Sequence, residues 1–141
     1  MNIKIIYWTG TGNTEKMAEA IFSGAQEAGT SVEMKSVSSA TIEDVQSANI
    51  LAFGCPSMGD EVLEENEMEP FITSIEDIIS GKTILLFGSY GWGDGAWMRD
   101  WEKRFSEKGA VLVDGKGFIS QEMPDDADLI KLKELGRTLA T

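Results

Sequence analysis

Short apolar runs alternate along this chain with stretches whose apolar residues recur at helical spacing, and this alternation most constrains its fold. The clearest run covers residues 82–88, "KTILLFG", and a similar one covers residues 3–8. Runs that are apolar at nearly every position are typical of strands buried on both faces, as in parallel sheets covered by helices. Strands and helices that alternate in this way predict an α/β fold.

The runs and the helical stretches predict one domain over residues 1–141, without linker, repeat or low-complexity segment. Strands are expected at residues 3–8, 31–37, 49–54, 82–88 and 110–113, and Phe118 and Ile119 offer a continuation of the last. Residues 31–37 alternate apolar and polar side chains, which indicates a strand nearer the edge of the sheet. Helices are expected over residues 17–28, 41–47, 68–79, 97–105 and 129–139.

The absence of histidine excludes several classes of function. Acid–base catalysis by imidazole, Ser-His-Asp chemistry and imidazole metal ligation all require that residue. The single cysteine, Cys55, cannot form an internal disulfide or, without histidine, a credible zinc or iron–sulfur site. One cysteine fits a reducing cytoplasm, and the chain has neither an apolar run of the ~20 residues that a membrane span needs nor a signal-peptide layout. We therefore expect a cytoplasmic protein that binds no metal.

The formal charge of −12 is concentrated in one part of the chain, because no basic residue occurs between Lys35 and Lys82. The carboxylates in that window are Glu43, Asp44, Asp60, Glu61, Glu64, Glu65, Glu67, Glu69, Glu76 and Asp77. Such a surface repels nucleic acid and anionic membranes, and attracts a basic protein partner. A face that only keeps the protein in solution is the alternative.

Ligands of parallel sheets bind beyond the carboxyl ends of the strands, so the loops after the first, third and fourth strands are the candidate binding loops. In the first, residues 9–14 ("TGTGNT"), glycines let the backbone approach an anion, and amides at a helix start attract it. No lysine follows as in a P-loop, and Glu15 occupies the position of the third glycine in a dinucleotide fingerprint. A plain strand–turn–helix with good N-caps is the alternative.

The second loop, residues 55–65 ("CPSMGDEVLEE"), sets Gly59 between Met58 and Asp60, which gives a flexible peptide beside a soft apolar side chain. Cys55 at a strand end is also typical of a phosphatase nucleophile. That site needs an arginine six positions on, where this chain has Glu61, and neighbouring carboxylates raise the pKa of a thiol. We therefore interpret Cys55 as a small buried residue.

The third loop, residues 88–95 ("GSYGWGDG"), holds Tyr90 and Trp92 between glycines, which favours a flat ligand stacked against a ring. Trp97 and Trp101 lie four residues apart on a helix and are interpreted as packing residues. An anion cradle, a Met-Gly turn and a glycine-framed tryptophan at one sheet edge suit a flat aromatic molecule that carries a phosphate. Flavin mononucleotide (FMN) is such a molecule.

The three loops together resemble those of the flavodoxin family. The stretches "WTGTGNTEKMA", "GCPSMGDEVLEE" and "FGSYGWGDGAWMRDWE" match the family's three flavin loops in order and spacing, and the likeness covers essentially the whole chain. It is to the short-chain type of anaerobic bacteria, since no room remains for the segment that interrupts the fifth strand in long-chain members. The resemblance implies a three-layer sandwich with a five-stranded parallel sheet, in the order 2-1-3-4-5, and helices on both faces.

The resemblance also implies FMN as the cofactor and assigns residues to it. The phosphate would be bound as a dianion without basic side chains, by amides and hydroxyls of Thr9, Gly10, Thr11, Gly12, Asn13, Thr14 and Ser89. The isoalloxazine would lie between Met58 and Trp92, with Gly91 and Glu61 at its pyrimidine edge. The other implied contacts are Pro56, Ser57, Gly59, Asp60, Tyr90 and Gly93. Gln121, Glu122 and Met123 lie where members differ and are expected as flavin-edge contacts.

Members of this family are one-electron carriers rather than enzymes. By resemblance, the Gly59 peptide would turn its carbonyl toward N5–H of the reduced flavin, and glycine suits such a turn because φ becomes positive. The phosphate, Asp60 and Glu61 would make the second electron costly, so that the flavin would cycle between semiquinone and hydroquinone at low potential. Met58 and Trp92 would tune the potential as well.

The same resemblance implies a docking role for the acidic window, the stretch between Lys35 and Lys82. Flavodoxins replace ferredoxin between redox enzymes, and we expect a monomer that binds the basic docking surfaces of ferredoxin-linked oxidoreductases. The carboxylates expected to flank the flavin edge are Glu64, Glu65, Glu67 and Glu69.

Three other functions compete with this one. An FMN-dependent quinone or NAD(P)H reductase on the same fold needs a hydride-donor site over the flavin, on the face that Trp92 would obstruct. A signalling receiver domain needs acidic residues after the first strand and an aspartate after the third, where this chain has Trp8-Thr9 and Cys55-Pro56. A binding module that no longer holds a flavin is the third.

Overall fold

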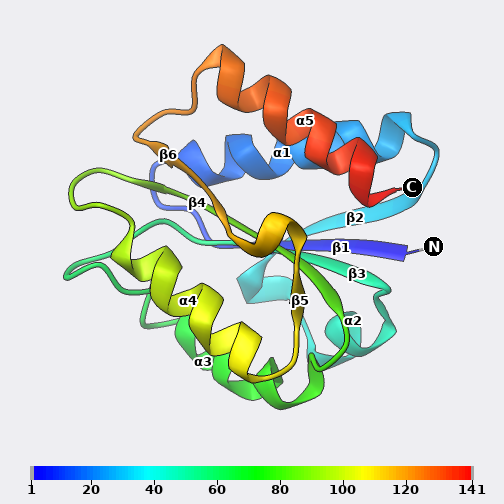
Figure 1. Cartoon of the computed structure of the whole chain (residues 1–141), viewed down its shortest axis with the longest axis horizontal. Coiled ribbons are helices and arrows are strands. Elements are labelled where there is room, and N and C mark those ends of the chain that lie inside the picture. The colour runs from blue at the N-terminus through cyan, green and yellow to red at the C-terminus, as the bar shows by residue number, and fades with distance from the viewer. Residues whose placement is uncertain (1, 141) are drawn as a thin grey trace.

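The computed structural model describes residues 2–140, and its helices and strands occur in the expected order (Figure 1). The strands are β1 (Asn2–Tyr7), β2 (Ser31–Ser36), β3 (Ile50–Gly54), β4 (Thr83–Tyr90), β5 (Val111–Leu112) and β6 (Phe118–Gln121). The α-helices are α1 (Asn13–Glu27), α2 (Ile42–Ser47), α3 (Met68–Ile75), α4 (Ala96–Glu107) and α5 (Asp126–Leu139). Turns of 3-10 helix follow β2, α3 and β5, at Val37–Ser39, Glu76–Ile78 and Val113–Gly115.

The strands form one parallel sheet in the order β2-β1-β3-β4-β5, which confirms the predicted order. The fifth strand is divided into two pieces that pair with different parts of β4. β5 pairs at Thr83 and Ile84, and β6 pairs along residues 87–90 of the same strand. The 3-10 turn between them contains Asp114 at φ 59°, a left-handed conformation that interrupts the extended backbone. The continuation expected at Phe118 and Ile119 is therefore confirmed.

Several elements begin or end at other residues than predicted, β4 and α3 among them. β4 runs on to Tyr90, so that Ser89 and Tyr90 belong to the strand rather than to the loop, because they pair with Ser120 and Gln121 of β6. The helix expected over residues 68–79 leaves α-helical geometry at Ile75 and continues only as a 3-10 turn. The extension of β4 depends on its pairing with β6, a tertiary contact that periodicity does not report.

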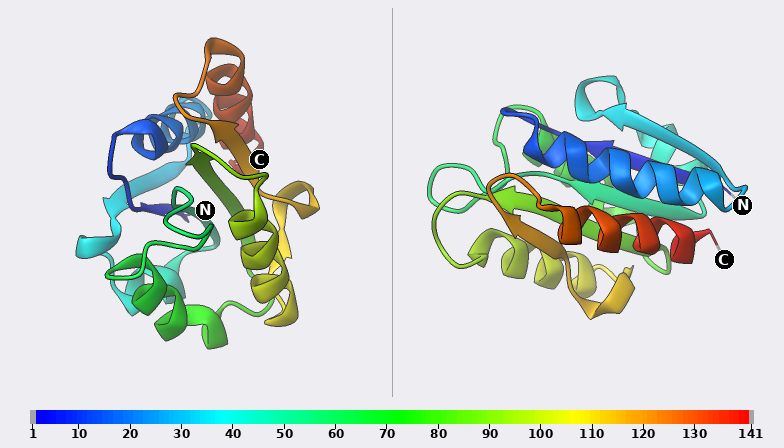
Figure 2. Two further views of the ribbon diagram at one scale, coloured as in Figure 1. Left: turned by 90° about the vertical axis from the view of Figure 1, so that its left-hand side faces the viewer. Right: turned by 90° about the horizontal axis from the view of Figure 1, so that it is seen from above.

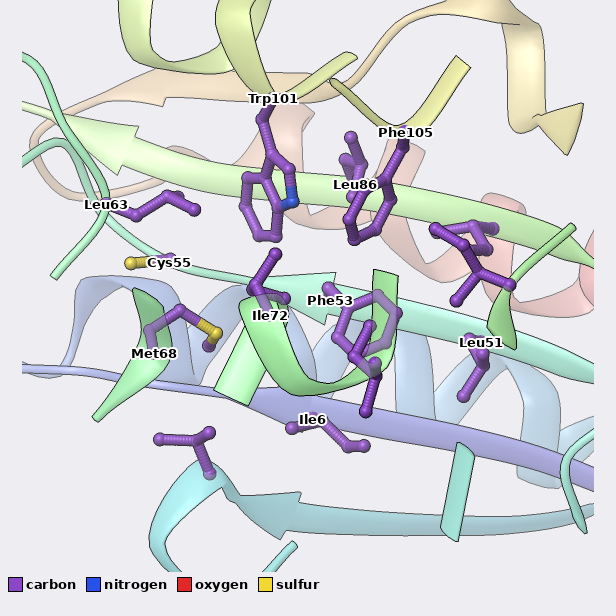
Figure 3. Close-up of a cluster of buried hydrophobic side chains, with 14 of the residues drawn as sticks. Ile6, Leu51, Phe53, Cys55, Leu63, Met68, Ile72, Leu86, Trp101 and Phe105 are labelled. Carbon is purple, nitrogen blue, oxygen red and sulfur yellow. The ribbon is translucent and has the colours of Figure 1, made fainter. Parts of the chain in front are cut away.

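Helices cover both faces of the sheet (Figure 1), and successive strand residues supply the two cores in turn. Along β1, Ile5 packs in the core under α1 and α5, whereas Ile6 packs in the core toward α3 and α4. Figure 3 shows the second core, where Phe53 of β3 lies beside Phe105 of α4, with ring centroids 5.7 Å apart. Trp97 and Trp101 are each 1% exposed, which confirms that they are packing residues.

Two helical glycines allow α1 and α5 to lie side by side on their face of the sheet, as Figure 2 (right) shows. A Cβ atom on Gly24 of α1 would collide with the backbone carbonyl of Lys133 in α5, and one on Gly136 of α5 would collide with that of Ile21. These backbones are thus in direct contact, and this helix pair closes the sheet face that carries Ile5 and Tyr7.

Candidate functional site

The carboxyl ends of β1, β3, β4 and β6 all reach the same edge of the molecule, at the left of Figure 1 and facing the viewer in Figure 2 (left). The loops that leave these strands surround a cavity of about 300 Å³. Its lining residues are Trp8, Gly10, Thr11, Asn13, Pro56, Ser57, Met58, Ser89, Tyr90, Gly91 and Glu122. The structure therefore brings all three predicted loops together at one site, which is of the size of small-ligand pockets.

The loop before α1 leaves the start of that helix without a side-chain cap. Gly12 takes φ 96°, which favours glycine, and its amide donates to the hydroxyl of Thr9 at 3.0 Å. By contrast, α2 and α5 begin with capping boxes built from Thr41 and Asp44 and from Asp125 and Asp128. The uncapped amides at the start of α1 are donors next to the cavity, where a helix end attracts an anion.

Two buried hydroxyls lie beneath this loop. Thr14 is 1% exposed and Ser89 is 5% exposed, and their oxygens lie 3.2 Å apart. Each hydroxyl has one proton and two lone pairs, so this contact leaves capacity for a further hydrogen bond. Ser89 also lines the cavity, and its contact with Thr14 joins the end of β4 to the start of α1.

The second loop forms a tight turn closed by two hydrogen bonds of 2.9 Å between the backbones of Met58 and Val62. Within it Gly59 takes φ 50°, and nothing lies within 4 Å of a Cβ atom added to it. Met58 is half-buried and lines the cavity, whereas Gly59 and Asp60 are exposed. The positive φ expected for Gly59 is thus present in the described chain.

The third loop leaves Trp92 exposed, whereas the sequence favours a ring stacked on a flat ligand. Tyr90 and Gly91 line the cavity, and Tyr90 packs against Trp97 with ring centroids 5.8 Å apart. Trp92 is 63% exposed and is not among the residues that line the cavity, and Gly93 beside it is also exposed. Trp92 therefore lies at the rim of this site, with its ring accessible to a partner or a ligand.

The last loop contributes one predicted residue to the lining. Glu122 lines the cavity, and its amide donates to the carbonyl of Tyr90 at 2.6 Å. Gln121 donates from its side chain to the carbonyl of Gly91 at 3.3 Å, and Met123 is 62% exposed. Gln121 and Glu122 thus contact the third loop.

The carboxylate of Glu61 lies at the start of α4, and Glu61 is not among the residues that line the cavity. Its Oε1 accepts the amides of Gly95 and Ala96, each at 3.2 Å. Glu61 itself takes φ 57°, which non-glycine residues seldom adopt.

Trp8 lines the cavity, although the sequence predicts it as the end of the first strand and assigns it no contact with the ligand. It lies just beyond β1, beside Gly10. Its indole nitrogen donates to the Glu67 carboxylate at 3.2 Å. The available signal was its position, because an aromatic residue at the carboxyl end of a parallel strand faces the ligand edge.

Some carboxylates between Lys35 and Lys82 are buried or paired, so fewer of them are available for docking than the composition indicates. Glu64, expected to flank the flavin edge as a docking charge, is 5% exposed and accepts the amides of Asn66, Glu67 and Met68, so that part of the expectation is wrong. Burial alone would raise the pKa of Glu64, but these hydrogen bonds lower it. Glu69 pairs with Arg104 at 2.8 Å. Glu65 and Glu67 remain exposed.

Cys55 is buried at the end of β3, as interpreted from the sequence, and burial raises the pKa of its thiol to about 12. We expect an aromatic disulfide reagent at pH 8 to react with the folded protein about a thousandfold more slowly than with the unfolded chain, since the thiolate is the nucleophile. Reaction at similar rates in both states would contradict this burial. As the pH rises from about 9 toward 12, the unfolded chain loses a proton that the folded chain keeps, so this group lowers the free energy of unfolding there.

The residues around the cavity fit a phosphate-bearing aromatic group. Amides and hydroxyls without a cation, at the uncapped start of α1, suit an oxyanion that is bound and not transferred. The apolar surfaces of Trp8, Met58 and Tyr90 suit a flat ring. Within residues 2–140, no group of three or more acidic or cysteine side chains could hold a metal, and none of the helices could cross a bilayer.

Comparisons with known proteins agree with this geometry. The Flavodoxin family model matches residues 5–135. The chain is 54% identical to a flavodoxin of Clostridium beijerinckii over 126 residues, which cover 89% of this chain and 91% of that protein. It is 43% identical to a flavodoxin of Megasphaera elsdenii over 138 residues, 98% of each. The solution structure of two-electron reduced Megasphaera elsdenii flavodoxin superposes with a TM-score of 0.86, at 41% identity over 98% of each chain.

Proposed function

This chain belongs to the flavodoxin family, and from that premise we propose that it is a low-potential one-electron carrier that binds FMN. Bound FMN would supply the redox chemistry by cycling between its one-electron-reduced and fully reduced forms. The chain would bind it, orient it and set the cost of each electron. In this proposal the protein is a carrier that replaces ferredoxin between redox enzymes, and not itself a catalyst.

The observation that carries the proposal is the uncapped start of α1 at the edge of the cavity. The amides of the first loop, with the hydroxyls of Thr14 and Ser89, would bind the phosphate. Because no lysine or arginine lies between Ile5 and Glu15, the charge of the phosphate is retained. A negative charge that no cation neutralises opposes the addition of the second electron to the flavin. For this one-electron step, ~59 mV of potential corresponds to about 1.4 kcal/mol.

The turn at Gly59 is the proposed control of the first electron. Its φ is 50°, and nothing lies within 4 Å of the place that a Cβ atom would take, so its peptide would have room to rotate and present its carbonyl oxygen to a proton on the reduced flavin. Met58 on the same turn would pack against the ring, and Trp92 at the rim would cover it from the other side.

Gly59→Ala tests this role. A Cβ atom disfavours positive φ by about 1–2 kcal/mol, so we expect the variant to accumulate several-fold less one-electron-reduced flavin than the wild type. The measurement is an anaerobic reductive titration followed by visible absorption. Gly115→Ala, at another exposed glycine with positive φ and nothing within 4 Å, is the matched control. An unchanged yield in Gly59→Ala refutes the role of the turn.

The partner and the setting belong to the same proposal. Exposed carboxylates on the loops of the site, among them Asp60, Glu65, Glu67 and Glu122, would attract the basic docking surfaces of ferredoxin-linked oxidoreductases. We propose a monomeric, single-domain protein of the cytoplasm, and its one cysteine, free and buried, fits a reducing compartment. This surface gives no attraction to nucleic acid or to an anionic membrane.

A further inference from the structure

The two loops that carry Met58 and Trp92 are joined by one carboxylate. Oε1 of Glu61, on the turn that Met58 and Val62 close, accepts the amides of Gly95 and Ala96, each at 3.2 Å. Gly95 is the N-cap residue of α4, and the loop with Trp92 leads directly into it. The contact spans 34 residues of sequence and connects the exit of β3 with the exit of β4.

The start of α4 depends on this distant carboxylate. α2 and α5 carry their own capping boxes, and the acceptor for the first amides of α3 is Glu64, close to that helix in sequence. Within the described chain, α4 has no acidic residue in its first turn, and its N-cap Gly95 at φ 98° has no side chain to accept a hydrogen bond. Amides at a helix start favour a negative partner, and Glu61 supplies it.

The backbone around Glu61 is arranged for this contact. Glu61 takes φ 57°, a left-handed conformation that a residue with a Cβ atom seldom adopts unless its surroundings hold it there. Gly93, at φ 88°, leaves room for the side chain, because a Cβ atom on it would collide with the Glu61 carboxylate. The strained turn and the glycine opposite it thus place the carboxylate between the loops.

We propose that Glu61 is a positioning residue, which fixes the turn of Met58 and Gly59 to the loop of Trp92 and so holds the two sides of the flavin site at one separation. This inference rests on the proposed function for its effect on the flavin, but the contact itself is a property of the chain alone. With the contact removed, FMN has to order both loops when it binds, and its affinity falls.

The test compares Glu61→Ala, Glu61→Gln and, as a control, Glu107→Ala at an exposed position at the far end of α4. Hydrogen exchange at the amides of Gly95 and Ala96 is followed by NMR in the full chain before FMN is added, with α5 amides as an internal reference. The dissociation constant of FMN is then measured by flavin fluorescence. We expect Glu61→Ala to speed exchange at both amides at least tenfold and to weaken FMN binding about tenfold. Glu61→Gln, which keeps Oε1, recovers most of both effects, and Glu107→Ala changes neither.

Unchanged exchange in Glu61→Ala would overturn the contact, and faster exchange with unchanged affinity would overturn its role in positioning. If Glu61→Ala does not fold, Glu61→Gln decides: exchange near the wild-type rate with nearly full affinity supports the proposal, whereas a large loss of affinity at that exchange rate overturns it. A wild-type chain that binds no FMN contradicts the proposed function instead, and the exchange data still decide whether Glu61 holds α4.

Discussion

Asn13→Asp is expected to weaken FMN binding about a hundredfold while leaving the flavin-free chain as stable as the wild type or slightly more so. Asn13 is the first residue of α1 and lines the cavity, where it would face the phosphate. At a separation of about 5 Å and an effective dielectric constant near 20, two unit charges repel by on the order of 3 kcal/mol. That energy corresponds to about a hundredfold in affinity.

The same substitution acts with the opposite sign on the helix. A carboxylate at the first turn interacts favourably with the helix dipole by about 0.3–1 kcal/mol, so the flavin-free chain should lose no stability. Fluorescence titration with FMN measures the affinity, and thermal unfolding without FMN measures the stability. Gln26→Glu, an exposed position near the other end of α1, makes the same charge change away from the cavity and should leave the affinity unaltered. An Asn13→Asp variant with wild-type affinity would show that no phosphate binds at this loop.

Gly24→Ala is expected to lower the free energy of unfolding by about 3 kcal/mol, although alanine favours helices over glycine by about 1 kcal/mol. The added methyl group would meet the carbonyl of Lys133, so α1 and α5 have to move apart along the face that they cover. The surroundings are backbone and cannot turn aside as a flexible side chain would. For a chain of this length the loss corresponds to a fall of roughly 10 °C in the midpoint of thermal unfolding.

Thermal and urea unfolding of the flavin-free chain measure this effect without interference from cofactor binding. Gln26→Ala lies on the exposed side of the same helix and should change the free energy of unfolding by less than about 0.5 kcal/mol. If Gly24→Ala proves as stable as the wild type, the close approach of α1 and α5 is incorrect. Gly136→Ala tests the same contact from the other helix, because its methyl group would meet the carbonyl of Ile21.

The order of the strands and helices could be predicted because the apolar pattern of each element reflects which of its faces are buried. The run at residues 82–88 is apolar on both faces since β4 is central, and the alternation at residues 31–37 reflects the edge position of β2. The interruption of the fifth strand follows from the left-handed Asp114, and only the isolated pair Phe118 and Ile119 hinted at it. The contact between Gly24 and α5 left no signal in the sequence, since a helical glycine alone does not tell what approaches it.

The candidate site could be located for a similar reason, because parallel strands bring the loops that follow them to one edge. Thr11, Met58 and Tyr90 therefore meet around one cavity although they lie far apart in sequence. The partners of individual carboxylates could not be predicted, since the charge of a residue does not tell which way its side chain points. Glu64 is turned inward as a helix acceptor, and Glu69 is paired with Arg104, 35 residues away. Trp8 was missed because an apolar residue at the end of a strand also fits a core.

The central claim is that this chain carries one electron at a time on bound FMN, and an anaerobic reductive titration of the purified protein, followed by visible absorption, tests it most directly. The account predicts a yellow protein that passes through a blue one-electron-reduced form before it bleaches. A yellow protein that bleaches in a single two-electron step would contradict the carrier and favour a flavin-dependent reductase. A colourless protein that also fails to bind added FMN would contradict the assignment of the cavity itself.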